Sequence, residues 1–274
     1  MTEGGFISMT NEIKKNLPPL SSINLSEKTK QIILGSLLGD GSLRIHRGYR
    51  NARFSFRHSI TQKEYFFWKV RQLKEISSSK CVFVQDPDKD SFSRKKKLRY
   101  CSRALLELTQ LYYITHKRKK LWIRRKWLNY MDSLGLAIWW FDDGSIISNG
   151  RKGVICTDGF ERESVKRLIR YLKVVWNIQT KIGKVEKKTK SGKTREYFRI
   201  WFRSANELKK FLTIILPHLE VKELLPKVIL LYKNSQLQQR WASEIARLTN
   251  FNLELINEYI RLKKARWKQF QKKI

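Results

Sequence analysis

Two short segments of the sequence resemble each other, and this repeat constrains the fold more than any other feature. Residues 33–41 (ILGSLLGDG) and 136–144 (LAIWWFDDG) are both apolar runs that end in Asp-Gly, and they lie about a hundred residues apart. A run of this kind is typical of a helix that ends at a glycine. One such run is common, but the pair predicts a chain built from two similar halves.

The residues that follow each segment predict the same order of strands and helices. Expected strands lie at 50–57, 81–85, 98–103, 153–157, 179–186 and 195–203, and expected helices at 61–76, 104–114, 161–176 and 204–216. A Ser/Thr-x-x-Glu capping box begins two of these helices, at Thr61 and Ser204. We therefore expect an α+β fold of two pseudo-symmetric αββαββα halves, each with an antiparallel sheet, packed through the two helices that end in Asp-Gly. The expected boundaries are an arm at 1–30, halves at 31–131 and 132–232, and a basic helical extension at 233–274.

The net charge of the chain indicates what kind of molecule it binds. The chain has 274 residues with 58 Lys+Arg against 24 Asp+Glu, a formal net charge of +34, and its 41% hydrophobic content is sufficient for a folded core. A folded chain with this excess charge attracts a polyanion, and nucleic acid fits best because its phosphates supply most of the sequence-independent affinity. A ribosomal protein would satisfy the same composition.

The strand expected at 195–203 shows how such a partner could be bound. Its alternate residues place Arg195, Tyr197, Arg199, Trp201 and Arg203 on one face and Phe198, Ile200 and Phe202 on the other. A sheet that is apolar on one face and cationic on the other can lie along a nucleic acid, although a solvated face would look the same.

Other classes of protein are disfavoured. The three cysteines lie far apart with no CxxC pair, so a disulfide framework or a structural zinc site is not expected. No apolar run approaches the roughly 20 residues of a membrane-spanning helix. Residues 1–30 lack the arginines of a transit peptide and the pattern of a secretory signal.

The two repeated segments also suggest chemistry. Asp40 and Asp143 each lie where an apolar helix ends, and the helix dipole makes that end electronegative, so a cation would stabilise carboxylates there. Oxygen ligands of this kind suit Mg²⁺. On a basic nucleic-acid surface, metal-assisted hydrolysis of a phosphodiester is the simplest interpretation.

The repeated motifs, together with the flanking runs LLGDG, RFSFRHS and WWFDDG, resemble the single-chain, two-motif, intron-encoded type of LAGLIDADG homing endonuclease. The resemblance covers residues 31 to about 232. It implies a saddle of strands over a long asymmetric double-stranded DNA target, and a double-strand break that leaves 3′ overhangs. It also implies two or three Mg²⁺ ions shared between Asp40 and Asp143, with Gly39 and Asp142 as neighbouring ligands and Asp142 as the rival of Asp143.

The resemblance implies further site residues. A basic residue is expected near each cut phosphate: Lys120, with Lys119 as a rival, before the second motif, and Lys222 after the last helix of the second half. His58 occupies a polar position where a role in hydrogen bonding or phosphate contact is favoured over that of a general base. The residues expected to bind DNA are Arg44, Arg47, Arg50, Arg53, Ser55, Arg57, His58, Arg94, Lys96, Lys184, Lys188, Lys193, Arg195, Tyr197, Arg199 and Arg203.

Alternative functions stay open at this point. The chief rival is an RNA maturase that assists splicing of its host intron, with or without DNA cleavage, and host intron RNA is then a partner. A ribosome-type binder would not predict the duplicated motif. A protein-splicing element is disfavoured because the sequence starts at Met1 and ends Lys273-Ile274 without a terminal His-Asn. We expect a monomer in an organelle, a mitochondrion or chloroplast, with a prokaryotic cytoplasm as the alternative.

Overall fold

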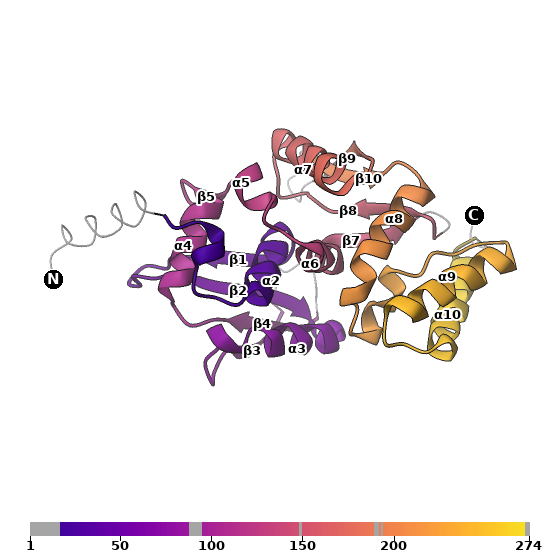
Figure 1. Ribbon diagram of the computed structural model, residues 1–274, viewed down its shortest axis with the longest axis horizontal. Coiled ribbons are helices and arrows are strands. Elements are labelled where there is room, and N and C mark those ends of the chain that lie inside the picture. The colour runs from indigo at the N-terminus through magenta and orange to yellow at the C-terminus, as the bar shows by residue number, and fades with distance from the viewer. Residues whose placement is uncertain (1–16, 88–94, 148–149, 189–191, 193, 272–274) are drawn as a thin grey trace. The chain divides into compact units, whose positions relative to one another are not determined.

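The computed structural model describes residues 17–87, 95–147, 150–188, 192 and 194–271 (Figure 1). Contacts within the chain divide it into two compact units, Met1–Gly135 and Leu136–Ile274. Each unit is described separately below.

The first unit contains a four-stranded antiparallel sheet in the order β1-β2-β4-β3, with α3 and α4 packed against it. In chain order its main elements are α2 (Glu27–Leu38), β1 (Gly41–Arg44), β2 (Arg53–Ser59), α3 (Lys63–Gln72), β3 (Val82–Gln85), β4 (Lys97–Cys101) and α4 (Leu106–Thr115). Shorter elements are η1 (Leu20–Ser22), η2 (Ile60–Gln62), η3 (Lys74–Ile76), the β5 (His116–Lys117) and β6 (Lys120–Leu121) hairpin, and α5 (Arg125–Leu128).

The second unit repeats this order after α6 (Ser133–Asp143), the helix that carries the second motif. Its antiparallel sheet has the order β7-β8-β10-β9, and α7 and α8 pack against it. The elements are β7 (Gly144–Ile147), β8 (Lys152–Ile155), α7 (Arg162–Trp176), β9 (Thr180–Lys188), β10 (Thr194–Phe202) and α8 (Ala205–Ile215), followed by η4 (Leu216–His218), η5 (Lys222–Lys227), α9 (Ser235–Leu248) and α10 (Leu253–Gln271). The expected α+β fold with two αββαββα repeats is confirmed, although none of the strand ranges expected from the sequence corresponds to β1 or β7.

In the described part of the chain, no helix is both long enough and apolar enough to span a lipid bilayer.

The glycine of each motif lets the following strand turn back against its helix. A Cβ on Gly41 would lie 2.7 Å from the backbone oxygen of Ser36, one turn earlier in α2. A Cβ on Gly144 would lie 2.2 Å from the indole ring of Trp140 in α6. The close approach admits no side chain, so Asp-Gly fixes each aspartate at the junction of helix and strand.

Each sheet has one face buried against helices and one face left polar. On β2, Phe54, Phe56 and His58 are buried while their neighbours are more exposed. The aromatic ring of Phe202 on β10 packs against Trp140 and Phe211, at centroid distances of 5.7 and 5.0 Å. Burial alternates along β2. In β10, for which alternation was predicted, it is limited to Ile200–Phe202, because Phe198 is half-buried like Arg199.

Polar side chains begin several of the helices, but one predicted cap is wrong. Ser26 accepts a hydrogen bond from the backbone N–H of Thr29 and begins α2. Ser204 accepts one from Glu207 and begins α8, as predicted. Thr61 does not cap α3, because Ser59 caps the short turn η2 there and α3 runs only from Lys63 to Gln72.

Candidate active site

Asp40 lies between α2 and β1 and lines a pocket of about 210 Å³ in the first unit. Its side chain is 42% exposed. The other residues around the pocket are mostly polar or cationic: Ser42, Arg44, His46, Ser55, Phe56, Arg57 and Arg99. In this pocket the Asp40 carboxylate lies beside arginines that attract phosphate, and a carboxylate oxygen in that position can serve as a metal ligand.

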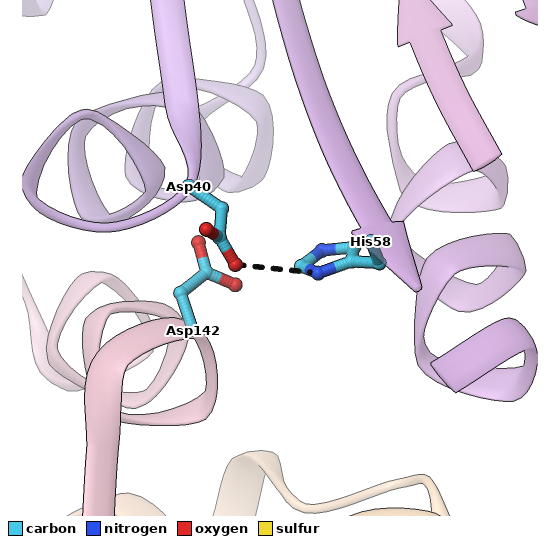
Figure 2. A group of neighbouring side chains, drawn as sticks. All are labelled: Asp40, His58 and Asp142. Carbon is cyan, nitrogen blue, oxygen red and sulfur yellow. Dashed lines mark ion pairs between the residues drawn. The ribbon is translucent and has the colours of Figure 1, made fainter. Parts of the chain in front are cut away.

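His58 supports Asp40 from within the unit. Figure 2 shows the ring of His58 directed at the carboxylate of Asp40, with 3.4 Å between Nδ1 and Oδ2. The His58 side chain is only 1% exposed and packs against the rings of Phe56 and Tyr65. This burial is at odds with the predicted contact between His58 and a DNA phosphate. The geometry suits a residue that orients the Asp40 carboxylate.

The second unit places two carboxylates at the C-terminal end of α6. Asp142 and Asp143 are its last two residues, and both are half-buried; Figure 2 shows Asp142 at this helix end. The backbone oxygen of Asp143 accepts a hydrogen bond of 3.0 Å from the N–H of Cys156, just beyond β8. The helix end is therefore attached to the sheet, and the preference for Asp143 over Asp142 as the metal ligand stays a prediction.

A lysine that sequence reasoning missed lies at the same helix end. The ammonium of Lys227, in η5, donates hydrogen bonds to the backbone oxygens of Phe141 and Asp142, the latter at 3.1 Å. In return, the indole N–H of Trp140 donates to the backbone oxygen of Lys227 at 3.0 Å. The predicted residue, Lys222, is exposed at the start of η5 and is not the one that meets α6.

The sequence does contain a signal for Lys227. It stands in the run Leu224-Leu-Pro-Lys227-Val228, in which the leucines and the valine are buried. A lysine within an apolar run of this kind needs a polar partner, here the carbonyl oxygens at the end of α6. The family resemblance favours Lys222 by its position after the preceding helix, but a match in position takes no account of burial.

Lys120 lies on the short hairpin of β5 and β6. Arg118 and Lys119 form its turn in left-handed backbone conformations, with φ of 49° and 65°. Lys117, Arg118, Lys119 and Lys120 are all exposed. The hairpin therefore presents both predicted candidates, Lys119 and Lys120, to solvent. Gly39 is the half-buried C-cap of α2, and its N–H donates to the backbone oxygen of Ser36.

Most residues predicted to bind DNA lie where a large ligand could reach them. Those that are exposed are Arg44, Arg47, Arg50, Arg57, Lys96, Lys184, Lys188, Arg195 and Arg203, and those that are half-buried are Arg53, Ser55, Tyr197 and Arg199. Arg94 and Lys193 lie outside the described residues.

Three of these cations are already paired with carboxylates, and one of them, Arg199, lies 2.7 Å from Asp158. Lys184 lies 2.8 Å from Glu186 and 2.5 Å from Glu196, and these hydrogen bonds raise the pKa of its ammonium. Lys96 lies 3.0 Å from Asp86. A cation in such a pair attracts phosphate less strongly than a free one, so their predicted share in DNA affinity is reduced.

Comparison with known proteins adds independent information. The model of the LAGLIDADG DNA endonuclease family matches residues 30–211. DNA endonuclease I-ChuI of Chlamydomonas applanata is 25% identical over 67% of this chain and 85% of that protein. Cytochrome b mRNA maturase bI2 of Saccharomyces cerevisiae is 26% identical over 79% of this chain and 51% of that protein, and Protein RecA of Mycobacterium gastri is 30% identical over 58% of this chain and 39% of that protein. The chain thus spans most of the first relative but only about half or less of the other two.

Among solved structures, the homing endonuclease I-WcaI bound to its DNA recognition sequence is similar, with a TM-score of 0.62. The similarity covers 81% of this chain and 92% of that one at 20% sequence identity, so it concerns the fold.

Proposed function

The chain belongs to the LAGLIDADG DNA endonuclease family, and from this premise we propose that it is a site-specific homing endonuclease. It would make a double-strand break with 3′ overhangs in a long asymmetric DNA target by metal-dependent hydrolysis. The observation that carries the proposal is the pocket at Asp40, where one carboxylate faces Arg44, Arg57 and Arg99. Such a site attracts a phosphodiester and holds an oxygen ligand beside it.

The residues at the two motif ends fit Mg²⁺. Each unit has a carboxylate directly before the glycine that follows its motif helix, Asp40 in the first and Asp143 in the second. Carboxylate oxygens are hard ligands of the kind that Mg²⁺ prefers. When bound, the metal would stabilise charge on the phosphate and lower the pKa of a water molecule.

The residues of the chain would each have a separate role. Asp40 and Asp143 would hold the metal, and His58 would keep the Asp40 carboxylate in place. The arginines of the Asp40 pocket would bind the DNA backbone. Lys227 and Lys120 would stabilise the charge that develops on the phosphate, Lys227 because its ammonium lies at the end of α6.

A cleavage assay tests the proposal. The purified protein with Mg²⁺ should make one double-strand break in an intron-lacking copy of its host gene. Asp40→Asn and Asp143→Asn should each abolish the break while DNA binding is retained, because only the metal ligand is neutralised. Glu258→Gln, at an exposed position on α10, is the control. Full cleavage by both motif variants would exclude the assigned ligands.

A second candidate function is RNA maturation, and the similarity to yeast cytochrome b mRNA maturases favours testing it. The same preparations should be assayed for binding to the host intron transcript. If the wild-type protein cuts no DNA but binds this RNA tightly, the maturase function replaces the endonuclease. Cleavage together with RNA binding would indicate a bifunctional protein.

We also propose that the protein acts as a monomer in an organelle, a mitochondrion or chloroplast. The duplicated motif supports the monomer, because a single chain already supplies both carboxylates. Light scattering during size-exclusion chromatography should give the mass of one chain. A mass of two chains would contradict this part of the proposal.

A further inference from the structure

In the second unit, the carboxylate of Asp158 holds the side chain of Arg199, one of the residues expected to bind DNA. Asp158 lies shortly after β8, and its two oxygens accept hydrogen bonds of 2.7 Å from Nε and Nη2 of Arg199 on β10. The ammonium of Lys187 on β9 also donates to Asp158, at 2.7 Å. One aspartate thus ties together three neighbouring segments of the sheet.

Arg199 lies on the face of β10 opposite the core. Its neighbours Ile200 and Phe198 point to the other side of the strand, where Ile200 is fully buried. The Arg199 side chain is 19% exposed and the Asp158 side chain 25%. The pair is therefore sheltered but still reachable from the cationic face.

The indole of Trp201 helps to shape the space beside Arg199. Gly183 is the Cα partner of Arg199 on β9. A Cβ on Gly183 would lie 2.3 Å from Nε1 of Trp201, so the indole occupies the place that any side chain would take. Arg199 is thus held by Asp158 beside the indole of Trp201, which packs against the backbone of Gly183.

The geometry of the guanidinium leaves a defined set of donors. Asp158 uses the side formed by Nε and Nη2, whereas the end formed by Nη1 and the second N–H of Nη2 takes no part in this pair. Two parallel N–H groups at the end of an arginine match the O6 and N7 acceptors of guanine in the major groove. An arginine whose other side is already bonded loses less rotamer freedom when it makes that contact.

Asp158 keeps its charge under any condition suited to DNA binding. The hydrogen bonds from Arg199, and then those from Lys187, hold the pKa of Asp158 at about 2, below its ordinary 3.8. The Arg199 pair is therefore intact across the neutral range.

We propose, on the basis of the proposed DNA-binding function, that Asp158 is a positioning residue that orients Arg199 to read one guanine of the target. Arg195 on the same face of β10 provides a comparison. It is exposed, and among the described residues it has no carboxylate partner. A cation of that kind suits a phosphate contact, which fixes the position of DNA but does not discriminate between bases.

Selection from a randomised library tests this assignment whatever the target sequence is. Wild type, Asp158→Asn, Arg199→Lys and, for comparison, Arg195→Lys are each used, without Mg²⁺, to enrich duplexes from a pool with a long randomised segment. Wild type should enrich a sequence that contains a strongly preferred guanine. In Asp158→Asn and in Arg199→Lys, the preference for guanine at that one position should be about tenfold weaker. Arg195→Lys, at an expected phosphate contact, should weaken binding to every duplex about equally and should not change which base is preferred at any position.

A second measurement changes the DNA instead of the protein and so avoids any effect on folding. Replacing the identified guanine by 7-deazaguanine removes the N7 acceptor and should weaken binding by wild type about tenfold, but weaken binding by Arg199→Lys much less. If wild type enriches no sequence, the proposed endonuclease function fails. If wild type enriches a sequence but the Asp158 and Arg199 variants keep the same base preferences and lose affinity evenly, Arg199 contacts a phosphate and the assignment to a guanine is overturned.

Discussion

Lys222 and Lys227 belong to the same short segment, η5, but only one meets the motif helix. The ammonium of Lys227 donates to the backbone oxygens of Phe141 and Asp142 in the last turn of α6, where the helix dipole is negative, while Lys222 is exposed. At the scale of single residues, the direction in which a side chain points therefore matters more than its spacing from a motif.

Replacing Lys227 by Met should affect both stability and catalysis. The loss of charged hydrogen bonds to two backbone oxygens should lower the free energy of unfolding by about 1–2 kcal/mol. Cleavage should slow about a hundredfold, because a positioned cation near the reacting phosphate is lost. Urea denaturation and single-turnover cleavage measure the two effects.

The matched control is Lys222→Met, in the same segment. Its free energy of unfolding should change by less than about 0.5 kcal/mol, because the side chain is exposed. If the Lys222 variant lost cleavage and the Lys227 variant did not, the roles assigned here would be reversed.

At the scale of elements, the junction of helix and strand in each motif depends on the absence of a side chain. In α2 and β1, a Cβ on Gly41 would overlap the backbone oxygen of Ser36, and backbone atoms cannot move aside as a flexible side chain can. In the second unit, a Cβ on Gly144 would overlap the indole ring of Trp140. The position of each motif aspartate is therefore coupled to the stability of its helix and strand.

Gly41→Ala should lower the free energy of unfolding by about 1–3 kcal/mol, as expected for overpacking. Gly159→Ala is the control, because no atom lies within 4 Å of a Cβ built there. Chemical denaturation compares the two. Equal stability of both variants would show that β1 can move away from α2 without cost.

The C-terminal helix α10 supports the segment that carries Lys227. Lys263 donates hydrogen bonds of 2.7 Å to the backbone oxygens of Pro226 and Ile229. Burial lowers the pKa of Lys263 to about 7, from an ordinary 10.5. The lysine is thus part of the support for η5, although its sequence places it in a basic run that is typical of surface charge.

This pKa predicts how stability changes with pH. Between pH 7 and 10.5 the unfolded chain keeps a proton on Lys263 that the folded protein has lost, so the free energy of unfolding should rise as pH increases through this window. Below pH 7, Lys263 is protonated in both the folded and the unfolded chain, so it does not change the free energy of unfolding with pH. Denaturation of wild type and Lys263→Met at the two ends of the window isolates the effect, since the variant lacks the titrating group. Identical pH dependence in the two proteins would contradict it.

At the scale of the whole molecule, the charge of +34 is distributed over both units. Exposed arginines and lysines occur on the strands and loops of each sheet, and ion pairs at Lys96, Lys184 and Arg199 neutralise some of them. The remaining cations would supply the affinity for DNA that does not depend on sequence.

DNA affinity should therefore fall steeply with salt. If about six or more phosphates are neutralised, raising the salt concentration from about 50 to about 200 mM should weaken binding by about a thousandfold. Fluorescence anisotropy with a labelled duplex measures this dependence, and a duplex of unrelated sequence is the comparison. A flat salt dependence would exclude phosphate contacts as the main source of affinity.

The sequence alone determined the repeat, the αββαββα order of each half, and the place of Asp40 and Asp143 at the C-terminal ends of their motif helices. These features depend on residues close together in the chain: apolar periodicity, helix caps and the glycine that follows each aspartate. Only the tertiary structure decided that Lys227 rather than Lys222 meets α6, that His58 is buried beneath Asp40, and that Asp158 holds Arg199. Each of these contacts joins residues far apart in the sequence, so its geometry is set by how the strands and helices pack and not by any local pattern.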